Sequence, residues 1–424
     1  MTPVSRRIPY GPILPESWGV VPLKHLATLQ NGYVFKSEGW ADSGTPIIRI
    51  ENLNGSESFN LSGLAVNEKH HVRSGDLLFS WSGNPGTSFG PYRWSKSGLY
   101  FLNQHIFKVS VQGCEKDWLY WSLRAATFWI ERELTSGMIG MVHVTKEELS
   151  NVPIPIPSRD EQRRIAHFLD VEIAKIDRLA ELRRSMLARL EERERSVRDG
   201  LVERMFEQRG EIPLRRFTAI IEQGESPQCE AASRDSVDEW AVLKLSSVRR
   251  GIFESEENKR LPPGVVPNRS CEIQAGDLLV TRANTPNLVG DVAVASGRCE
   301  RLLLPDLIYR VKLGAGILPA FAAQVALSGR VRAVIESSAR GSSQSMVKLR
   351  GEDIKAWPMP RVTTEQQREL IRDMERTTAA SGRLRESIVC QLALLTERRR
   401  ALITAAVTGQ LDVTTARPAH DRDL

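Results

Sequence analysis

The sequence has little cysteine and lacks any long apolar run. Its 424 residues contain five cysteines, with no Cys-x-x-Cys pair and no cluster of cysteine with histidine. A disulfide framework and a zinc site are therefore not indicated. No apolar stretch approaches the roughly 20 residues of a membrane span, and the first residues lack the apolar core of a signal peptide. We therefore expect a cytoplasmic protein.

Catalytic motifs are missing as well. The sequence has no Gly-x-x-x-x-Gly-Lys-Ser/Thr phosphate loop, so ATP-driven translocation is not expected in this chain. It has no Asp/Asn-Pro-Pro-aromatic motif either, so methylation of a base amino group is not expected. A nuclease that binds Mg²⁺ through Asp238 and Glu257 is a rival hypothesis, but such a pattern arises readily by chance among 52 acidic residues. These absences favour a non-catalytic protein that binds neither metal nor cofactor.

A stretch without proline, from Asp160 to about Gln208, predicts one long helix. At 1.5 Å per residue this helix is roughly 70 Å long, so a partner helix is needed to cover its apolar stripe. Twelve basic and twelve acidic residues cancel between Asp160 and Arg209, whereas an arm that grips phosphates would carry a net positive charge. We interpret the helix as a structural spacer. Its apolar residues recur with a mean step of about 3.5 residues, the coiled-coil period: Ile165, Leu169, Ile176, Leu179, Met186, Leu190, Val197 and Leu201.

A second apolar stripe lies near the C-terminus. It is interrupted between Thr377 and Gly382, and Gly409 is its expected stop. Two such stripes in one chain can cover each other as an antiparallel coiled coil. The alternative is that each helix pairs with a helix of another subunit. The second stripe consists of Leu370, Met374, Leu384, Ile388, Leu392, Leu395, Leu402 and Ala406.

The chain repeats itself, and each motif recurs roughly 200 residues further on. Gly75-Asp76-Leu77-Leu78 recurs as Gly276-Asp277-Leu278-Leu279. In each half, a Pro-Leu pair precedes a glycine near the start, and a Pro-x-Pro motif precedes a Glu-Gln pair near the end. The order of the motifs is the same in both halves, which indicates a tandem duplication. The further matches are Val21-Pro22-Leu23 and Gly32 with Ile212-Pro213-Leu214 and Gly224, and Pro155-Ile156-Pro157 and Glu161-Gln162 with Pro358-Met359-Pro360 and Glu365-Gln366.

Each half is expected to be a globular domain of about 140 to 150 residues followed by a long helix. Short β-rich runs come first in each half and helical patterns later, which predicts an α+β fold with mixed sheets, duplicated in tandem. A capping box of Ser158 with Glu161 starts the first helix, and Thr363 or Thr364 caps the second. The expected ranges are 1–157 and 210–360 for the globular domains, 158–209 and 361–412 for the helices, and 413–424 for the tail.

Several motifs together resemble one family. Pro15-Glu16-Ser17-Trp18, followed by Leu23, opens the first domain, and the exits PIPIPSRDEQRRIAHF and WPMPRVTTEQQRELI lead into the two helices. The segment from Ala401 to Val413 closes the set. In this order and repetition, the motifs resemble those of the specificity (S) subunits of type I restriction-modification systems. The second domain departs from the pattern, because Gly210 to Phe217 replaces the Pro-Glu-x-Trp start.

The resemblance implies a non-catalytic subunit that reads double-stranded DNA. In that family, two target recognition domains each read one half of a split site. The paired helices fix the distance between the domains and dock two methyltransferase (modification) subunits, through which restriction/translocase subunits join. S-adenosylmethionine, ATP and Mg²⁺ are then expected only on the partner subunits. A formal net charge of +6 permits DNA as a partner. The alternative is a coiled-coil scaffold for protein partners, without DNA readout.

Residues that read bases must match base edges: Arg matches guanine, Asn or Gln matches adenine, and acids match cytosine. Polar residues in the loops after the β-rich runs are the candidates. Asn84 and Asn284 follow Asp76 and Asp277 by eight and seven residues, which indicates one loop in two copies. Any single candidate is more often an ordinary turn residue, so three pairs of loops are proposed as a set. The predicted DNA-binding residues are Arg49, Glu51, Asn52, Ser82, Asn84, Asn103, Gln104 and His105 in the first domain, and Lys244, Ser246, Arg282, Asn284, Ser343, Gln344 and Ser345 in the second.

Overall fold

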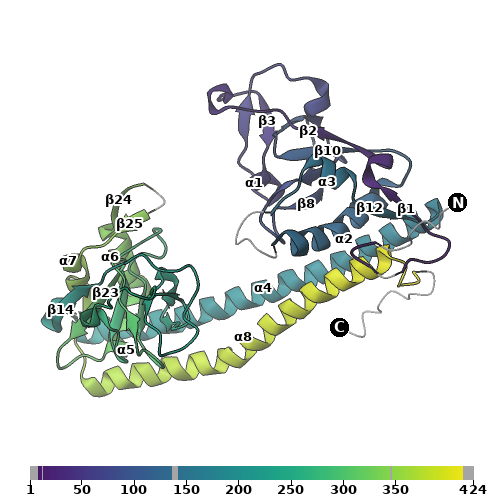
Figure 1. Cartoon of the computed structure of the whole chain (residues 1–424). Coiled ribbons are helices and arrows are strands. Elements are labelled where there is room, and N and C mark those ends of the chain that lie inside the picture. The colour runs from purple at the N-terminus through teal and green to yellow at the C-terminus, as the bar shows by residue number, and fades with distance from the viewer. Residues whose placement is uncertain (1–7, 12, 136–141, 344–345, 414–424) are drawn as a thin grey trace. The chain divides into compact units, whose positions relative to one another are not determined.

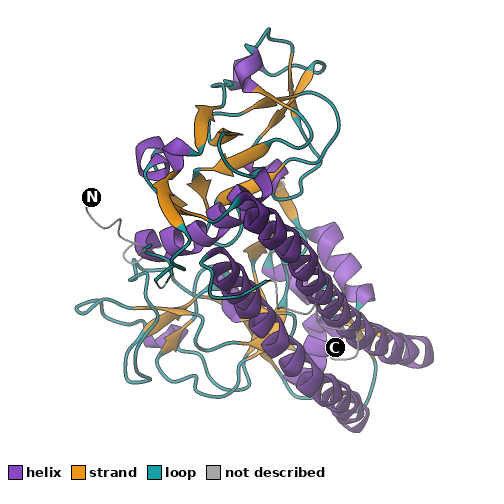
Figure 2. Ribbon diagram, turned by 90° about the vertical axis from the view of Figure 1, so that its right-hand side faces the viewer, coloured by secondary structure: helices purple, strands orange, loops and turns teal. Residues whose placement is uncertain are grey.

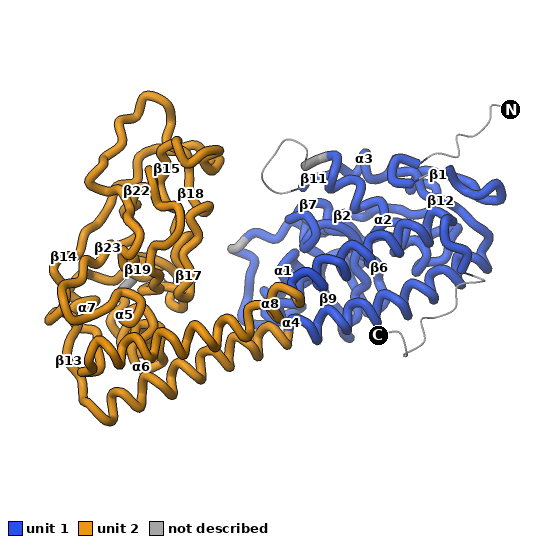
Figure 3. The backbone as a smooth tube through the Cα atoms, turned by 90° about the horizontal axis from the view of Figure 1, so that it is seen from below, with its two compact units in different colours: residues 1–184, 389–424 blue, residues 185–388 orange. Residues whose placement is uncertain are grey.

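The computed structural model describes residues 8–11, 13–135, 142–343 and 346–413 (Figure 1). The chain divides into two compact units, residues 1–184 with 389–424, and residues 185–388 (Figure 3). Each unit combines one globular domain with parts of both long helices, α4 (Arg159–Arg209) and α8 (Thr364–Val407). Along the chain, each globular domain is followed by its own long helix. The compact units do not follow this division, because each contains parts of both helices. Within the described ranges, none of the helices combines the length and apolarity that crossing a membrane requires.

The first globular domain contains two four-stranded sheets (Figures 1 and 2). One is antiparallel with the order β2-β10-β6-β8, and the other has the order β4-β3-β9-β5, in which β3 and β9 are parallel. Strand β1 pairs with β12, so the first and last strands of the domain lie side by side just before α4. The strands are β1 (Gly19–Pro22), β2 (Ala27–Asn31), β3 (Thr45–Ile48), β4 (Asn60–Ser62), β5 (His71–Val72), β6 (Leu77–Ser80), β7 (Ser82–Gly83), β8 (Gly90–Arg93), β9 (Tyr100–Leu102), β10 (Ile106–Val111), β11 (Val142–His143) and β12 (Pro153–Ile156), and the helices are α1 (Ile50–Leu53), α2 (Lys116–Thr135) and α3 (Lys146–Ser150).

The second globular domain repeats this plan. Its antiparallel sheet has the order β14-β23-β19-β21, its second sheet has the order β18-β15-β22 with β15 and β22 parallel, and β13 pairs with β26 just before α8. The predicted α+β fold and its duplication are thus confirmed. The elements are β13 (Glu211–Pro213), β14 (Thr218–Gln223), β15 (Ala241–Leu243), β16 (Val248–Arg249), β17 (Ile252–Phe253), β18 (Asn258–Arg260), β19 (Leu278–Thr281), β20 (Ala283–Asn284), β21 (Val292–Val294), β22 (Leu302–Leu303), β23 (Ile308–Leu313), α5 (Pro319–Ala326), α6 (Gly329–Ser338), β24 (Arg340–Ser343), β25 (Met346–Lys348), α7 (Gly351–Lys355) and β26 (Pro358–Pro360).

The repeated Gly-Asp-Leu-Leu motif is a turn with an ion pair. In the first domain Gly75 has a φ of 87°, a conformation that glycine adopts without strain. The carboxylate of Asp76 accepts the backbone N–H of Arg73 at 2.9 Å, which closes the turn before β6. The same carboxylate lies 2.8 Å from Nζ of Lys108 on the neighbouring strand β10. The motif therefore joins the start of one central strand to the next.

The second copy of the motif makes the same contacts in a more buried place. Gly276 has a φ of 94°, and the carboxylate of Asp277 accepts the backbone N–H of Gln274 at 2.9 Å. Lys312 on β23 lies 2.8 Å from this carboxylate, and Arg310 lies 3.5 Å from it. The side chain of Asp277 is only 6% exposed. The motif thus recurs because it closes the same turn and makes the same ion pair between neighbouring strands in both domains.

The glycine that opens each repeat marks a close approach of two backbone segments. A Cβ atom on Gly32 would lie 2.0 Å from the carbonyl oxygen of Asn103. A Cβ atom on Gly224 would lie 1.8 Å from the carbonyl oxygen of Leu304. Any larger residue would push these segments apart. Residues 103–105 and 304–307 therefore occupy matching places in the two domains.

Both long helices begin with a side-chain cap, as predicted. Ser158 Oγ lies 2.7 Å from a carboxylate oxygen of Glu161, and that carboxylate accepts the backbone N–H of Ser158 at 3.0 Å. In the second copy Thr363 is the cap, and its backbone N–H donates to Oε1 of Gln366 at 3.1 Å. Glu161 therefore corresponds to Gln366. Pairing Glu161 with Glu365 by identity of residue type was wrong by one position.

The glutamine that follows each cap fastens its helix to the domain. Gln162 accepts the backbone N–H of Glu115 at 2.8 Å, just before α2. Gln367 accepts the backbone N–H of Leu318 at 2.8 Å and donates to the carbonyl of Gly316 at 2.8 Å, just before α5. Both glutamine residues are 2% exposed. The position of each helix start is thus set by buried hydrogen bonds.

Helix α8 is shorter than expected but unbroken. It runs from Thr364 to Val407, whereas the sequence suggested 361–412. The interruption of the apolar stripe does not interrupt the helix, because Thr377 and Ser381 donate to carbonyls one turn back at 2.8 Å. Gly409, with a φ of 70°, follows directly and ends the helix as expected.

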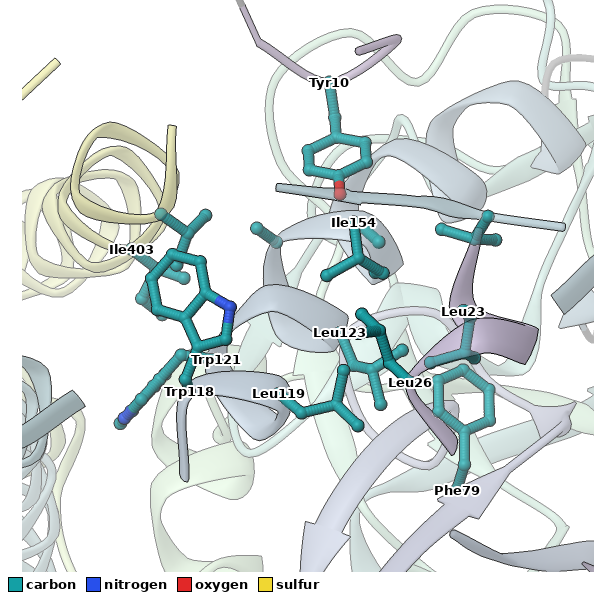
Figure 4. Packing of buried hydrophobic residues seen from close by; sticks show 14 of the residues in the cluster. Tyr10, Leu23, Leu26, Phe79, Trp118, Leu119, Trp121, Leu123, Ile154 and Ile403 are labelled. Atoms are coloured by element: carbon teal, nitrogen blue, oxygen red, sulfur yellow. The ribbon is translucent and has the colours of Figure 1, made fainter. Parts of the chain in front are cut away.

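The two long helices run antiparallel in each unit. In the first unit Arg399 of α8 lies 3.0 Å from Asp177 of α4, and residues nearer the end of α8 share a core with residues nearer the start of α4. Figure 4 shows one of them, Ile403, beside Trp118 and Trp121 of α2. In the second unit Arg385 of α8 lies 2.9 Å from Glu194 of α4. Each domain therefore rests on a helix pair.

The two copies of the Gly-Asp-Leu-Leu turn offer a matched test of burial. We expect Asp277→Ala to destabilise the second domain by about 2–3 kcal/mol, because the N–H of Gln274 loses its acceptor and the buried guanidinium of Arg310 keeps only Glu222 as a carboxylate partner. Asp76→Ala should cost no more than about 2 kcal/mol, since Asp76 is 27% exposed and water can reach Lys108. Hydrogen exchange of the peptides from β19 and β23, compared with those from β6 and β10, measures both losses. Equal losses would show that burial does not control the contribution of this turn.

Candidate nucleic-acid interface

Two of the three predicted loops of the first domain meet at one surface pocket. The pocket has a volume of about 400 Å³. Arg49 and Glu51 lie on one side, and residues 103–105 lie on the other. Two aromatic residues that were not predicted, Phe35 and Trp40, complete the lining together with Ile50. The pocket thus combines aromatic rings with groups that can hydrogen-bond to base edges.

Arg49 and Glu51 are held in place by their neighbours. Arg49 Nη1 lies 3.1 Å from Oε1 of Glu51 and donates to Oδ1 of Asn60 at 2.9 Å. The Arg49 guanidinium also lies 5.5 Å from the centre of the Trp40 ring. Both charged side chains remain about half exposed, at 40% for Arg49 and 53% for Glu51. They are therefore ordered and accessible to a ligand.

Asn52 does not share this accessibility. It is 4% exposed, and its Oδ1 accepts the backbone N–H of Arg49 at 2.9 Å. Its amide nitrogen donates to the carbonyls of Ser56 and Ser58 at 3.2 and 2.7 Å. These bonds cap the short helix α1 and shape the turn after it. The predicted DNA contact of Asn52 is contradicted by this geometry, since its amide is used inside the protein.

Trp81 connects the remaining loop of the first domain to the pocket. Its Nε1 donates to the carbonyl of Gln104 at 3.0 Å, and its ring lies 5.2 Å from the ring of His105. The next candidate, Ser82, is 5% exposed in β7, so its side chain is not open to DNA. Asn84 is exposed at the start of the following loop. The structure therefore places Arg49 and Gln104 in one pocket, which Trp81 contacts through Gln104. Asn84 lies three residues further along the chain, and Ser82 is buried.

In the second domain the predicted residues form two separate groups. Ser246 donates to Oε2 of Glu257 at 2.6 Å, and Lys244 Nζ lies 4.0 Å from the same oxygen. Arg282 instead donates to the carbonyl of Asp306 at 3.3 Å. Asn284 accepts the backbone N–H of Thr285 with its own Oδ1 at 2.8 Å. Lys244 and Ser246 thus contact a carboxylate, whereas Arg282 and Asn284 belong to the loop after β19.

The third pair of loops was matched wrongly. Backbone N–H groups of equivalent residues, Trp81 and Arg282, donate to His105 and Leu307, so residues 304–307 correspond to 103–105. Strand β7 pairs with β11 as β20 pairs with β25. The counterpart of residues 343–345 is therefore the segment before β11. Ser343 ends β24, and Gln344 and Ser345 lie outside the described residues.

Four residues near these loops were missed. Phe35 and Trp40 line the pocket, His143 lies with its ring 4.7 Å from that of Trp81, and Asp306 contacts Arg282 through its carbonyl. A signal for Asp306 exists in the sequence, because LLPDLIYRV aligns with FLNQHIFKV across the two halves. Phe35 and Trp40 precede the first β-rich run, so a search of loops after strands could not find them.

The carboxylates of the rival nuclease hypothesis do not assemble. Asp238 lies 3.8 Å from Arg301, whereas Glu257 accepts the hydroxyl of Ser246. Among the residues whose placement is described, no three His, Cys, Asp or Glu side chains group as a metal site would require. A metal-dependent nuclease requires such a group of carboxylates.

Comparisons with known proteins identify relatives of this chain. The family model of the type I restriction modification DNA specificity domain matches residues 15–185, which contain the first globular domain and the start of α4. The EcoEI specificity subunit of Escherichia coli is 30% identical over 158 residues, a match that covers 37% of this chain and only 27% of that protein. The EcoKI specificity subunit of Escherichia coli strain K12 is 23% identical over 428 residues and is matched over nearly its whole length, with 94% of this chain and 90% of that protein covered.

A solved structure supports the same fold assignment. It is described as the structural basis of complex assembly and conformational transition of the type I R-M system. Its chain is 16% identical to this one, with a TM-score of 0.51, and the match covers 94% of this chain and 99% of that chain. These matches show that residues 15–185 match the type I restriction modification DNA specificity domain, and that nearly the whole chain is similar to a type I restriction enzyme specificity subunit and shares its fold with the solved structure.

Proposed function

We propose that this chain reads a bipartite, asymmetric DNA site, with one half-site bound by each globular domain. The observation that carries this proposal is that the central sheets of the two domains have the same strand order, whereas the polar side chains in their loops differ. The first domain presents Arg49, Asn84 and Gln104, and the second presents Arg282 and Asn284. Domains of the same shape bind DNA in the same manner, whereas different polar side chains select different bases. Two unlike half-sites at a fixed spacing follow from this arrangement.

We further propose that the long helices dock two methyltransferase subunits, through which restriction/translocase subunits join. Both units leave large apolar side chains of the helices exposed. In the first unit these are Val171 and Leu182 of α4 with Val389 and Leu394 of α8, at 39%, 49%, 54% and 57% exposure. In the second unit they are Met186 and Leu384, at 37% and 40%. Exposed apolar side chains on both units support two docking surfaces, one for each partner.

In this proposal the chain itself carries out no chemistry. Adenine methylation and ATP-dependent cleavage belong to the partner subunits, which bind S-adenosylmethionine, ATP and Mg²⁺. This chain supplies sequence recognition and holds the partners on the same DNA. Base flipping for methylation is then a step of the methyltransferase.

Footprinting tests the bipartite site. The chain, assembled with a methyltransferase encoded beside it, is expected to protect two short DNA segments separated by an unprotected or weakly protected spacer. The target is first found by mapping methylated adenines in the host genome. In this proposal the paired helices act as a rigid spacer, so lengthening the DNA spacer by one base pair should abolish binding. Protection of one contiguous half would exclude the bipartite model.

Native mass spectrometry tests the docking. Co-expression with the neighbouring methyltransferase is expected to give a complex with two methyltransferases per chain. Leu394→Glu in α8 should remove one of them, since a charge would have to be buried at the contact. A chain that associates only with itself, and binds no methyltransferase, would favour the protein scaffold without DNA readout.

A single polar substitution tests the pocket of the first domain. Gln104→Ala should reduce discrimination at one base pair of one half-site by about 1–3 kcal/mol, because the amide that reads that base edge is lost. The other half-site should keep its full discrimination. Gln112→Ala, an exposed glutamine just after β10 in the same domain, is the matched control. Binding of oligonucleotides with single base changes measures both variants, and equal effects of the two substitutions would count against the pocket.

A further inference from the structure

In both domains, a buried charged side chain from a helix holds the loop that carries the candidate asparagine. We call residues 84–88 the first reading loop and residues 284–289 the second. In the first domain Glu131 of α2, 6% exposed, accepts the backbone N–H of Gly86 at 2.6 Å. In the second domain Arg332 of α6, with a side chain 17% exposed, donates to the carbonyls of Val289 at 2.8 Å and Asn287 at 3.4 Å.

We propose that Glu131 and Arg332 are positioning residues for DNA specificity, each for the half-site of its own domain. Neither needs to touch DNA. Each fixes the backbone of one reading loop, and the loop in turn fixes Asn84 or Asn284. This inference rests on the proposed reading of DNA by the two domains.

The first reading loop shows why an external support matters. Its own bonds define its shape, because the N–H of Asn84 donates to Oγ of Ser88 at 2.6 Å and the carbonyl of Asn84 accepts three backbone N–H groups at 3.1, 3.2 and 3.4 Å. These bonds lie within residues 84–89, so they do not fix the position of the loop on the domain. Glu131 supplies that link at Gly86. A second link comes from Tyr92 on β8, whose hydroxyl donates to the carbonyl of Thr87 at 2.6 Å.

Tyr92 keeps this role over the whole working range of pH. Burial raises its pKa to about 12, so its hydroxyl stays protonated and can donate at neutral pH. Glu131 accepts the N–H of Gly86, the residue just before Thr87, so one support accepts a hydrogen bond from the loop and the other donates one to it. A reading residue placed with an error of half an ångström loses much of its hydrogen bond to a base edge.

The second reading loop is held by the opposite chemistry. The guanidinium of Arg332 donates to two backbone carbonyl groups near the end of the loop. Thr281 at the end of β19 adds a hydroxyl bond to the carbonyl of Leu288 at 2.9 Å. Here the backbone turns its carbonyls toward the helix, whereas in the first domain it turns an N–H toward the helix. Hydrogen bonds with an ionised partner are stronger than neutral ones, so both supports are well suited to fixing a loop.

The exchange of charge between the copies supports a role in specificity rather than in folding alone. The turn with Asp76 or Asp277 is unchanged between the domains, as expected of a structural element. The loop support differs, being a carboxylate of α2 in the first domain and a guanidinium of α6 in the second. The two loops therefore present different backbone faces while the sheets beneath them stay alike. Loops that present different backbone faces on sheets of the same kind are what the recognition of two unlike half-sites requires.

Substitution of each support tests the proposal in the assembled methyltransferase complex. Glu131→Met removes the acceptor, and Arg332→Met removes the donors, with similar side-chain length. The measured quantity is kcat/KM for methylation of the cognate DNA and of DNAs with a single base change in either half-site. Each variant is expected to lose discrimination about tenfold in one half-site and less than twofold in the other, and the two variants must affect different halves.

Conservative variants separate positioning from simple packing. Glu131→Gln keeps an acceptor oxygen and should restore most of the discrimination, and Arg332→Lys keeps one donor and should restore part of it. Glu133→Met on α2 and Arg330→Met on α6 are controls, each two residues from its support, and they should leave discrimination in both half-sites unchanged. Arg330 pairs with Glu203 and Glu211, so its loss also tests whether breaking other ion pairs of α6 is enough to change specificity.

Two outcomes would overturn the proposal. One is a loss of thermal stability with unchanged discrimination, and the other is an equal loss of discrimination in both half-sites from either variant. A wild-type complex with no sequence preference in either half would instead refute the proposed function itself. The same set of DNAs distinguishes these cases.

Discussion

A buried glutamine at the start of each long helix determines how each globular domain sits on its helix. Gln162 donates to the carbonyl of Pro157 at 2.9 Å and accepts the N–H of Glu115, so one amide joins the last strand, the helix α4 and the start of α2. Gln367 binds the N–H of Leu318 and the carbonyl of Gly316, so it joins α8 to the segment just before α5. Leaving either pair of backbone groups unpaired inside the protein would cost about 1–3 kcal/mol for each group. Because α2 carries Glu131, the position of the first reading loop on the helix pair depends on this amide.

The sequence predicted the large elements well because their signals are local. The first long helix was expected over 158–209 and runs from Arg159 to Arg209, since a proline-rich exit and a capping box mark its start. The second was expected to begin at 361 but begins at Thr364, because the N–H of Arg361 still donates to the carbonyl of Gly210 and keeps the chain extended. The cap at Thr363 uses Gln366 in place of a glutamate, which explains why matching by residue type was one position short.

The site was predicted less completely, because it depends on contacts between distant segments. Arg49, Glu51 and Gln104 share a pocket as polar loop residues should, but Asn52 is used to cap α1, a role that residue type alone does not distinguish from base reading. The third pair of loops was matched wrongly, because the correspondence is set by the pairing of β7 with β11 and of β20 with β25. Pairing between distant strands leaves no local pattern in the sequence. Trp40 was missed since stacking partners need not follow a strand.

If each domain reads its own half-site, as proposed, the two domains show how one fold can acquire two specificities. Elements that hold the sheet together are the same in both: the Asp turn, the glycine at the close approach, the capped helix start and the glutamine beneath it. The supports of the reading loops differ in charge and in the backbone group that they bind. A loop transferred alone from the first domain to the second would present the N–H of Gly86 to the guanidinium of Arg332, two donors facing each other. Loop and support must therefore change together, so the unit of specificity in this fold includes a helix residue as well as the loop.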